Sequence, residues 1–196
     1  MYGTRDGKFK VKKLEVRDKV PVSYTIPKLQ AVSTTVIVAG WNVSAGTTAK
    51  TNLDFLIQPT YPVNLTVNTK VAGTAGSGDG LVFVGYNQFG DKVTETVYVS
   101  GTAAETNVTD NCYSFLTSIT PDDAVHKSTD VNIGVGSALG MPWPIASSGD
   151  ILTYSYNSAY ATTADYAVGT VGTNKLRPKT LAADATLQVI YKSSFQ

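Results

Sequence analysis

The single histidine of the chain, His126, lies close in sequence to Asp122, Asp123, Ser128 and Asp130. A serine, a histidine and an acid brought together could supply the nucleophile and base of an acyl transfer. No nucleophile-elbow pattern surrounds the serine, and proximity in sequence does not bring side chains together. We therefore interpret His126 as a residue of an exposed loop and expect no catalytic triad.

The other segments that could carry chemistry are a lone thiol and two glycine clusters. Cys112 has no second cysteine to pair with, and one cysteine with one histidine is too few for a nitrogen and sulfur metal site. The cluster Gly76 to Gly80 lacks the Lys-Ser/Thr of a phosphate loop, and Gly134 to Gly140 lacks the dinucleotide spacing. We expect a protein that is not an enzyme and that holds no metal or cofactor.

The elements that must position any functional surface are strands. Gly80 to Gly101 shows two alternating runs around the turn Asn87 to Asp91, in which Gly90 supplies a positive φ, so a β-hairpin is predicted. On the second run, Thr94 to Thr96 is expected to face solvent. Because the hairpin contains no residues that usually do chemistry, we interpret it as scaffold.

Similar strand signals recur along the chain, without helical periodicity. The expected strands are Phe9 to Val16, Val20 to Ile26, Thr34 to Asn42, Leu53 to Ile57, Val63 to Val71, Leu81 to Tyr86, Val93 to Val99, Tyr113 to Ile119, Val131 to Val135, Ile151 to Asn157, Tyr166 to Thr170 and Leu187 to Lys192. Gly, Pro, Asn, Asp and Ser clusters separate them. The fold class predicted is all-β: an antiparallel β-sandwich, jelly-roll-like, with an extended basic N-terminal arm. Residues 1–28 are expected to form the arm and edge strands, and residues 29–196 a single domain.

Charge is concentrated at the N-terminus. Residues 1–28 carry eight basic and three acidic side chains, a net charge of +5, against −4 for the rest. Such an arm suits an acidic partner surface, either a neighbouring copy or another protein. The residues expected to make this contact are Lys8, Lys10, Lys12, Lys13, Arg17 and Lys19.

Two other interpretations of the arm remain open. Nucleic acid is less favoured, because the alternation of Lys8, Phe9, Lys10, Val11 and Lys12 resembles a strand with one solvated face and no aromatic stacking platform accompanies it. A charged edge strand that only discourages aggregation is the structural alternative. No apolar run approaches the roughly 18 residues of a membrane span. The N-terminus also lacks the apolar core of a signal peptide, so synthesis in the cytoplasm is expected.

A second contact candidate is the loop Leu139 to Pro144, which contains Met141 and Trp143. Its two prolines oppose ordinary strand pairing and leave large apolar side chains in a loop. Such a loop either plugs the end of the sandwich or forms a contact between subunits.

Several segments resemble a widespread group of tailed-bacteriophage virion proteins. They are Asp54 to Leu56, Tyr61 to Val67, Gly85 to Thr96, Ser114 to Ile119, Val131 to Pro142, and Asn174 to Tyr191, which together span roughly Leu53 to Tyr191. Met141 stands where that group's pattern favours leucine. The matching segments are turns and strands without catalytic residues, and the basic arm lies outside them.

The resemblance implies a capsid-associated protein located on the virion surface. The expected function is that of a decoration or cement protein, which binds the major capsid protein as a homotrimer and reinforces the shell. Two other functions remain open: a jelly-roll coat protein that forms the shell itself, and a tail or head-fibre module that binds host glycans through the aromatic loop. An enzyme acting on envelope polysaccharide is least favoured.

Overall fold

β-Strands dominate the part of the chain that the computed structural model describes, which comprises residues 20–43, 49–71, 80–98, 105–122, 128–143, 145, 147–157, 159–160, 166–168, 175–178 and 184–193. The strands are β1 (Val20–Ile26), β2 (Val38–Val43), β3 (Lys50–Thr51), β4 (Val63–Val71), β5 (Gly80–Asn87), β6 (Lys92–Tyr98), β7 (Glu105–Pro121), β8 (Ser128–Gly140), β9 (Ile151–Tyr156), β10 (Ala159–Tyr160), β11 (Tyr166–Val168), β12 (Lys175–Pro178) and β13 (Leu187–Ser193). One 3₁₀ turn, η1 (Ser148–Asp150), precedes β9.

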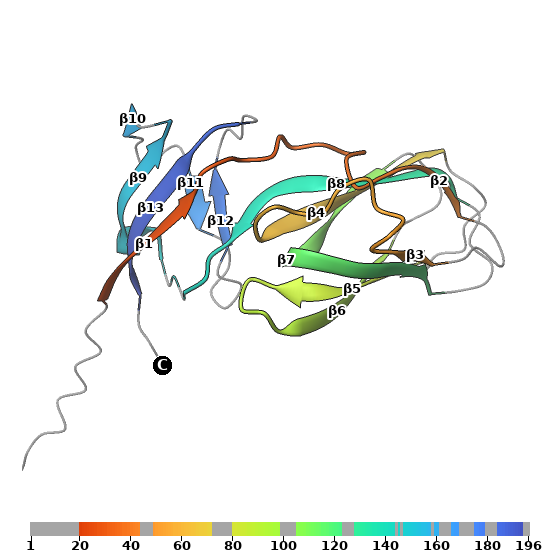
Figure 1. Cartoon of the computed structure of the whole chain (residues 1–196), viewed down its shortest axis with the longest axis horizontal. Coiled ribbons are helices and arrows are strands. Elements are labelled where there is room, and N and C mark those ends of the chain that lie inside the picture. The colour runs from red at the N-terminus through yellow and green to blue at the C-terminus, as the bar shows by residue number, and fades with distance from the viewer. Residues whose placement is uncertain are drawn as a thin grey trace, which may run out of the picture.

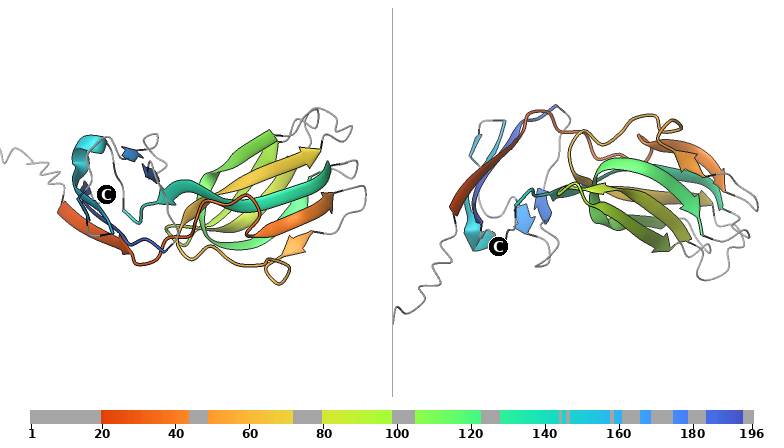
Figure 2. Two further views of the ribbon diagram at one scale, coloured as in Figure 1. Left: turned by 90° about the horizontal axis from the view of Figure 1, so that it is seen from above. Right: turned by 60° about the horizontal axis from the view of Figure 1, so that its bottom comes forward.

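Strands β2 to β8 form a β-sandwich with the strand order of a jelly roll. The first half of β7 pairs with β4, whereas its second half pairs with β3 and β5. Counting these halves separately gives one sheet in the order β2, β8, β4, first half of β7, and another in the order β3, second half of β7, β5, β6. All pairs are antiparallel. The predicted all-β, jelly-roll-like sandwich is therefore confirmed (Figures 1 and 2).

The long strand β7 passes from one sheet to the other near Tyr113, just after an irregularity in its pairing with β4. Thr66 pairs with Val108 and Asn64 with Cys112, so β7 has extra residues between these pairs. Glu95 of β6 holds this stretch: its carboxylate accepts hydrogen bonds from the backbone N–H groups of Asp110 and Asn111, the latter at 2.9 Å. The backbone donors of Asp110 and Asn111 thus stay paired where the regular ladder is interrupted.

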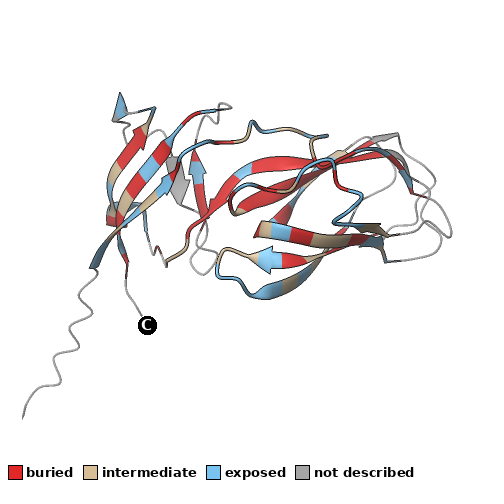
Figure 3. Ribbon diagram, in the orientation of Figure 1, coloured by how far each residue is buried: buried red, intermediate tan, exposed pale blue. Residues whose placement is uncertain are grey.

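The core of the sandwich lies between the two sheets. Phe83 and Tyr113 are fully buried, with ring centroids 6.4 Å apart. The other fully buried large side chains of the sandwich strands are Leu65, Leu116, Ile119, Ile133 and Leu139. Buried and more exposed residues alternate along β5 from residue 81, whereas residues 63–67 of β4 and 131–136 of β8 are buried without interruption, and β8 is largely red in Figure 3.

A second, smaller lobe stands beside the sandwich (Figure 1). Its sheet has the order β1, β13, β9, β10. β12 pairs with the end of β8 and β11 pairs with β12, so these two strands extend the sandwich sheet that contains β2, β8 and β4. β1 falls within residues 1–28, and it pairs along its whole length with β13. The expected boundary at residue 28 stays a prediction.

The expected strands can be compared where the structure describes them. Val20 to Ile26, Val63 to Val71 and the hairpin of β5 and β6 are confirmed, and Gly90 has φ of +82°. The expected strand Leu53 to Ile57 is wrong, because Asp54 closes a turn instead. The Asp54 carboxylate accepts hydrogen bonds from the backbone N–H of Thr51 at 2.7 Å and from the Thr51 hydroxyl at 2.9 Å. These bonds lower the pKa of Asp54.

Candidate functional site

Among the described residues, no group of three or more His, Cys, Asp or Glu side chains lies together. Asp122 accepts a hydrogen bond from the N–H of Gly80 at 2.9 Å, at the start of β5. His126 and Asp123 lie outside the described residues, as does most of the Gly76 to Gly80 cluster.

Cys112 is a buried structural residue. Its thiol donates to the carbonyl oxygen of Ala138 at 3.5 Å. Burial raises the pKa of the Cys112 thiol to about 12, so the nucleophilic thiolate is suppressed at neutral pH. Its position on β7, with the thiol against Ala138 of β8, favours a role in packing.

The two groups of predicted contact residues have different outcomes. Lys8, Lys10, Lys12, Lys13, Arg17 and Lys19 all lie outside the described residues. Met141 is fully buried, and Trp143 is half-buried and packs against the core. A loop that plugs the end of the sandwich must bury its large side chains, and the side chain of Met141 is fully removed from solvent. Met141 is thus corrected to a packing residue, because it has no exposed surface for a partner to contact.

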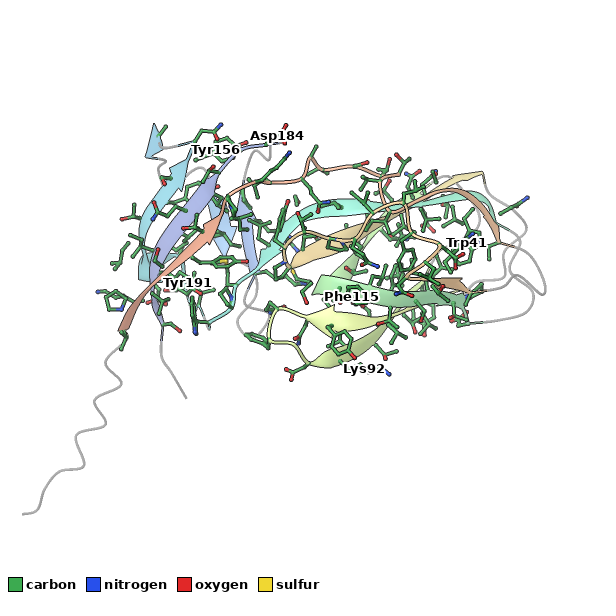
Figure 4. The ribbon with its side chains drawn as sticks, in the orientation of Figure 1. Trp41, Lys92, Phe115, Tyr156, Asp184 and Tyr191 are labelled. Carbon is green, nitrogen blue, oxygen red and sulfur yellow. The ribbon has the colours of Figure 1, made fainter. Side chains whose placement is uncertain are left out.

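The hydroxyl of Tyr191 holds this loop against the smaller lobe. It donates to the carbonyl oxygen of Trp143 at 3.1 Å and lies 3.2 Å from the Trp143 N–H, from which it accepts. Tyr191 comes from the middle of β13 (Figure 4) and is itself fully buried. The loop therefore joins the lobe to the sandwich.

The most distinctive exposed surface is an aromatic group at one end of the β5 to β7 sheet, here named the aromatic face. Its members, with their exposed fractions, are Tyr86 (41%), Phe89 (46%) and Phe115 (39%). Tyr86 of β5 is registered between Lys92 of β6 and Phe115 of β7. Cross-strand partners lie on the same side of a sheet, so the side chains of Lys92, Tyr86 and Phe115 form a continuous row across the three strands. Lys92 and Phe115 are labelled in Figure 4.

Two local features shape the aromatic face. At Gly85, a Cβ atom would overlap the backbone carbonyl of Phe115, so glycine permits the close approach of β5 and β7 just before Tyr86. In the turn, the Asn87 side-chain oxygen accepts hydrogen bonds from the N–H groups of Phe89 at 2.9 Å and Asp91 at 3.0 Å. The Asn87 turn therefore fixes where Phe89 projects.

Farther along the same side of the sheet, the aromatic face gives way to small polar and β-branched residues. Val84 is registered between Thr94 and Ser118, and Val82 between Thr96 and Thr120. These partners carry no charge at neutral pH. A flat surface of aromatic, β-branched and hydroxyl side chains can bind another protein by packing and a few hydrogen bonds.

The sequence predicted this hairpin but indicated only a scaffold role for it. Alternation places Val82, Val84 and Tyr86 together without saying whether they face core or solvent. Within residues 81–86 the buried ones are Leu81, Phe83 and Gly85, so the aromatic side is the outer one. Glu95 was expected to face solvent, and this is wrong, because its carboxylate binds the β7 backbone. The exposed Phe89 beside Gly90 was the available sequence signal.

Comparison of the chain with protein-family models, curated proteins and solved structures finds no match. In the described part of the chain, no helix has the length and apolar character needed to cross a membrane.

Proposed function

We propose that this chain is a tailed-bacteriophage virion protein that binds the outside of an icosahedral capsid and reinforces it. The observation that carries the proposal is the aromatic face on a jelly-roll sandwich. Exposed aromatic clusters are typical of protein contact sites, and jelly rolls are a recurrent architecture of capsid proteins. The sequence resemblance over Leu53 to Tyr191 supports the same class.

The mechanism is reinforcement by linkage. A protein that binds the assembled shell but not its separated subunits lowers the free energy of the assembled state, so rupture must also overcome the binding free energy. We propose a homotrimer at sites of local threefold symmetry. Its aromatic face packs on the major capsid protein, and the basic N-terminal residues meet an acidic area of the same surface.

The aromatic contact can be tested by reconstituting stripped shells with purified chain. The double variant Tyr86→Ser/Phe115→Ser should bind at least about 30-fold more weakly, since losing aromatic anchors costs roughly 2 kcal/mol or more. Leu152→Ser is the matched control, because Leu152 is also exposed (47%) but lies on β9 of the smaller lobe. Equal occupancy by the double variant and wild type would exclude the aromatic face as the contact.

The basic residues can be tested separately by deleting residues 1–19. The truncated chain should lose capsid occupancy at moderate salt, because the proposed charge contact has been removed. Unchanged occupancy would reject docking through the arm. The contact through the aromatic face would then depend only on the result for Tyr86→Ser/Phe115→Ser.

The strand order also favours a second candidate, the coat protein that forms the shell itself. Two four-stranded sheets in jelly-roll order are an architecture that coat proteins use. Purified chain that assembled by itself into closed particles would establish this function in place of decoration.

A further inference from the structure

Two leucines project into solvent from the turn at the end of β3. This turn comprises residues 51–56 and is here named the leucine turn. The exposed fractions of its leucines are 89% for Leu53 and 65% for Leu56. Apolar side chains scattered singly over a surface are ordinary, whereas two in one turn make a patch typical of a contact site.

Hydrogen bonds hold the leucine turn in a fixed shape. The Asp54 N–H donates to the Thr51 carbonyl oxygen at 2.8 Å, and the Asp54 carboxylate accepts in return from the Thr51 N–H and hydroxyl. The Leu56 N–H donates to the carbonyl oxygen of Ile37 at 2.9 Å. Because the turn is already ordered, a partner that covers the leucines loses little binding free energy to ordering them.

An apolar pocket of about 660 Å³ lies between the smaller lobe and the sandwich. This volume is within the range of pockets that bury small ligands, so it can take more than one leucine side chain. Leu53 and Leu56 do not line it, and the chain therefore does not fill its own pocket with them. The apolar residues that line the pocket include Tyr24, Ile26, Pro27, Val36, Ile57 and Pro62.

Polar groups around the pocket are paired within the chain. The Tyr61 hydroxyl accepts from the Gln30 N–H at 2.9 Å and donates to the Gln30 carbonyl oxygen at 3.2 Å. The Gln30 side-chain oxygen accepts from the Thr60 N–H at 3.2 Å. At the rim, Lys28 and Asp184 form an exposed ion pair of 2.9 Å. An apolar centre with a polar rim is typical of protein contact sites and selects an apolar occupant.

We propose that the leucine turn of one copy inserts Leu53 and Leu56 into the pocket of a neighbouring copy. The chain itself carries both surfaces, a protruding apolar turn and an apolar pocket that this turn leaves empty. The two surfaces differ, so the contact is heterologous, and a series of such contacts ends only by closing into a ring. The closure at three copies rests on the homotrimer of the proposed function, whereas the contact itself does not.

This contact is compatible with docking through the aromatic face. The leucine turn follows β3, an edge strand of its sheet, whereas the aromatic face lies on β5, on β7 and in the turn after β5. No residue of the aromatic face belongs to the leucine turn or lines the pocket. Joined copies therefore keep their aromatic faces free, and several faces on one ring bind a shell with higher avidity than a single face does.

Sedimentation equilibrium of the free, full-length chain tests both sides of the contact. Leu53→Ser/Leu56→Ser removes the apolar side chains of the turn, and Ala31→Trp fills the pocket from an exposed position that lines it. We expect wild type to associate and each variant to associate at least about 30-fold more weakly. Leu152→Ser, which alters an equally apolar exposed side chain (47%) on β9, is the control and should match wild type.

Mixing the two variants tests whether turn and pocket meet each other. The leucine variant keeps its pocket and Ala31→Trp keeps its turn, so an equimolar mixture should form pairs that neither variant forms alone and that cannot close a ring. Wild type that stays a single chain at every concentration, variants that associate as wild type does, or a mixture that contains only single chains would overturn the proposal.

Binding to stripped shells separates this contact from the proposed function. Wild type that associates through the leucine turn but does not bind shells would reject decoration and leave the contact intact. Shell binding that Leu53→Ser/Leu56→Ser abolishes, with no self-association of wild type, would overturn the proposal and assign the leucine turn to the capsid protein instead.

Discussion

At the scale of single residues, Gly134 leaves the least room for an added Cβ atom among the glycines of the described residues. A Cβ atom at this position would overlap the backbone carbonyl of Ser33, which crosses over β8. Ser33 cannot easily withdraw, because its N–H donates to the Val135 carbonyl at 3.0 Å and its carbonyl accepts from the Thr66 hydroxyl at 3.0 Å. A methyl group added at residue 134 must therefore displace the backbone of the Ser33 segment or of β8.

Gly134→Ala should therefore lower the free energy of unfolding by about 3 kcal/mol, as overpacking in a rigid core does. Gly149→Ala is the matched control, since the nearest atom to its added Cβ would be the Ser147 hydroxyl oxygen at 3.6 Å. Urea unfolding of both variants measures the difference. Equal urea midpoints for Gly134→Ala and Gly149→Ala would show that the segment containing Ser33 moves to accommodate the added methyl group.

The Tyr191 hydroxyl joins the loop at Trp143 to the smaller lobe through two hydrogen bonds. Tyr191→Phe keeps the ring and removes both, so we expect stability to fall by about 1–2 kcal/mol. Tyr98→Phe is the control because Tyr98 is 62% exposed. Chemical denaturation compares the two, and an unaffected Tyr191→Phe would mean that water replaces the hydroxyl.

At the scale of elements, the irregular stretch of β7 depends on one carboxylate. Glu95 accepts hydrogen bonds from the backbone N–H and side-chain amide of Asn111, both at 2.9 Å, and from the backbone N–H of Asp110. Glu95→Gln replaces one acceptor oxygen by an NH₂ group, which cannot accept, and should cost about 2 kcal/mol. Asp91→Asn, an equal loss of charge in the exposed hairpin turn, should cost little. Matching losses for the two variants would assign the effect to charge alone.

The elements that sequence predicted well are those determined by neighbouring residues. The turn at Asn87 and Gly90 contains its own hydrogen-bonding side chain and its own positive φ, so its position follows from local sequence. The first half of β7 was missed because polar residues interrupt its alternation, and its partners, β4 and Glu95, are distant in sequence. Which side of β5 is outermost depends likewise on how the sheets stack.

At the scale of the whole molecule, one cysteine thiol and several tyrosine hydroxyls that burial protects make stability sensitive to alkaline pH. Burial raises the pKa of Cys112, Tyr61 and Tyr191 to about 12 in each case, and it raises that of Tyr113 and Tyr24. The folded protein therefore holds these protons at pH values where the unfolded chain releases them.

The resulting contribution to stability is complete below the unfolded pKa values, near 9 for the thiol and 10 for the phenols, and is lost as pH rises toward about 12. Urea midpoints should be higher at pH 8 than at pH 10.5, and the difference should shrink in Tyr61→Phe. A midpoint that does not fall over this range would contradict the burial of these groups.

Purified virions show whether the chain reinforces a shell formed by another protein, as we propose. Virions are exposed to increasing chaotrope, and released protein and shell integrity are followed together. We expect this protein to dissociate while the shell is still closed, and the stripped shell then to rupture at lower chaotrope or temperature than the intact one. Release only at the concentration that breaks the shell, or stripped shells as resistant as intact ones, would contradict it.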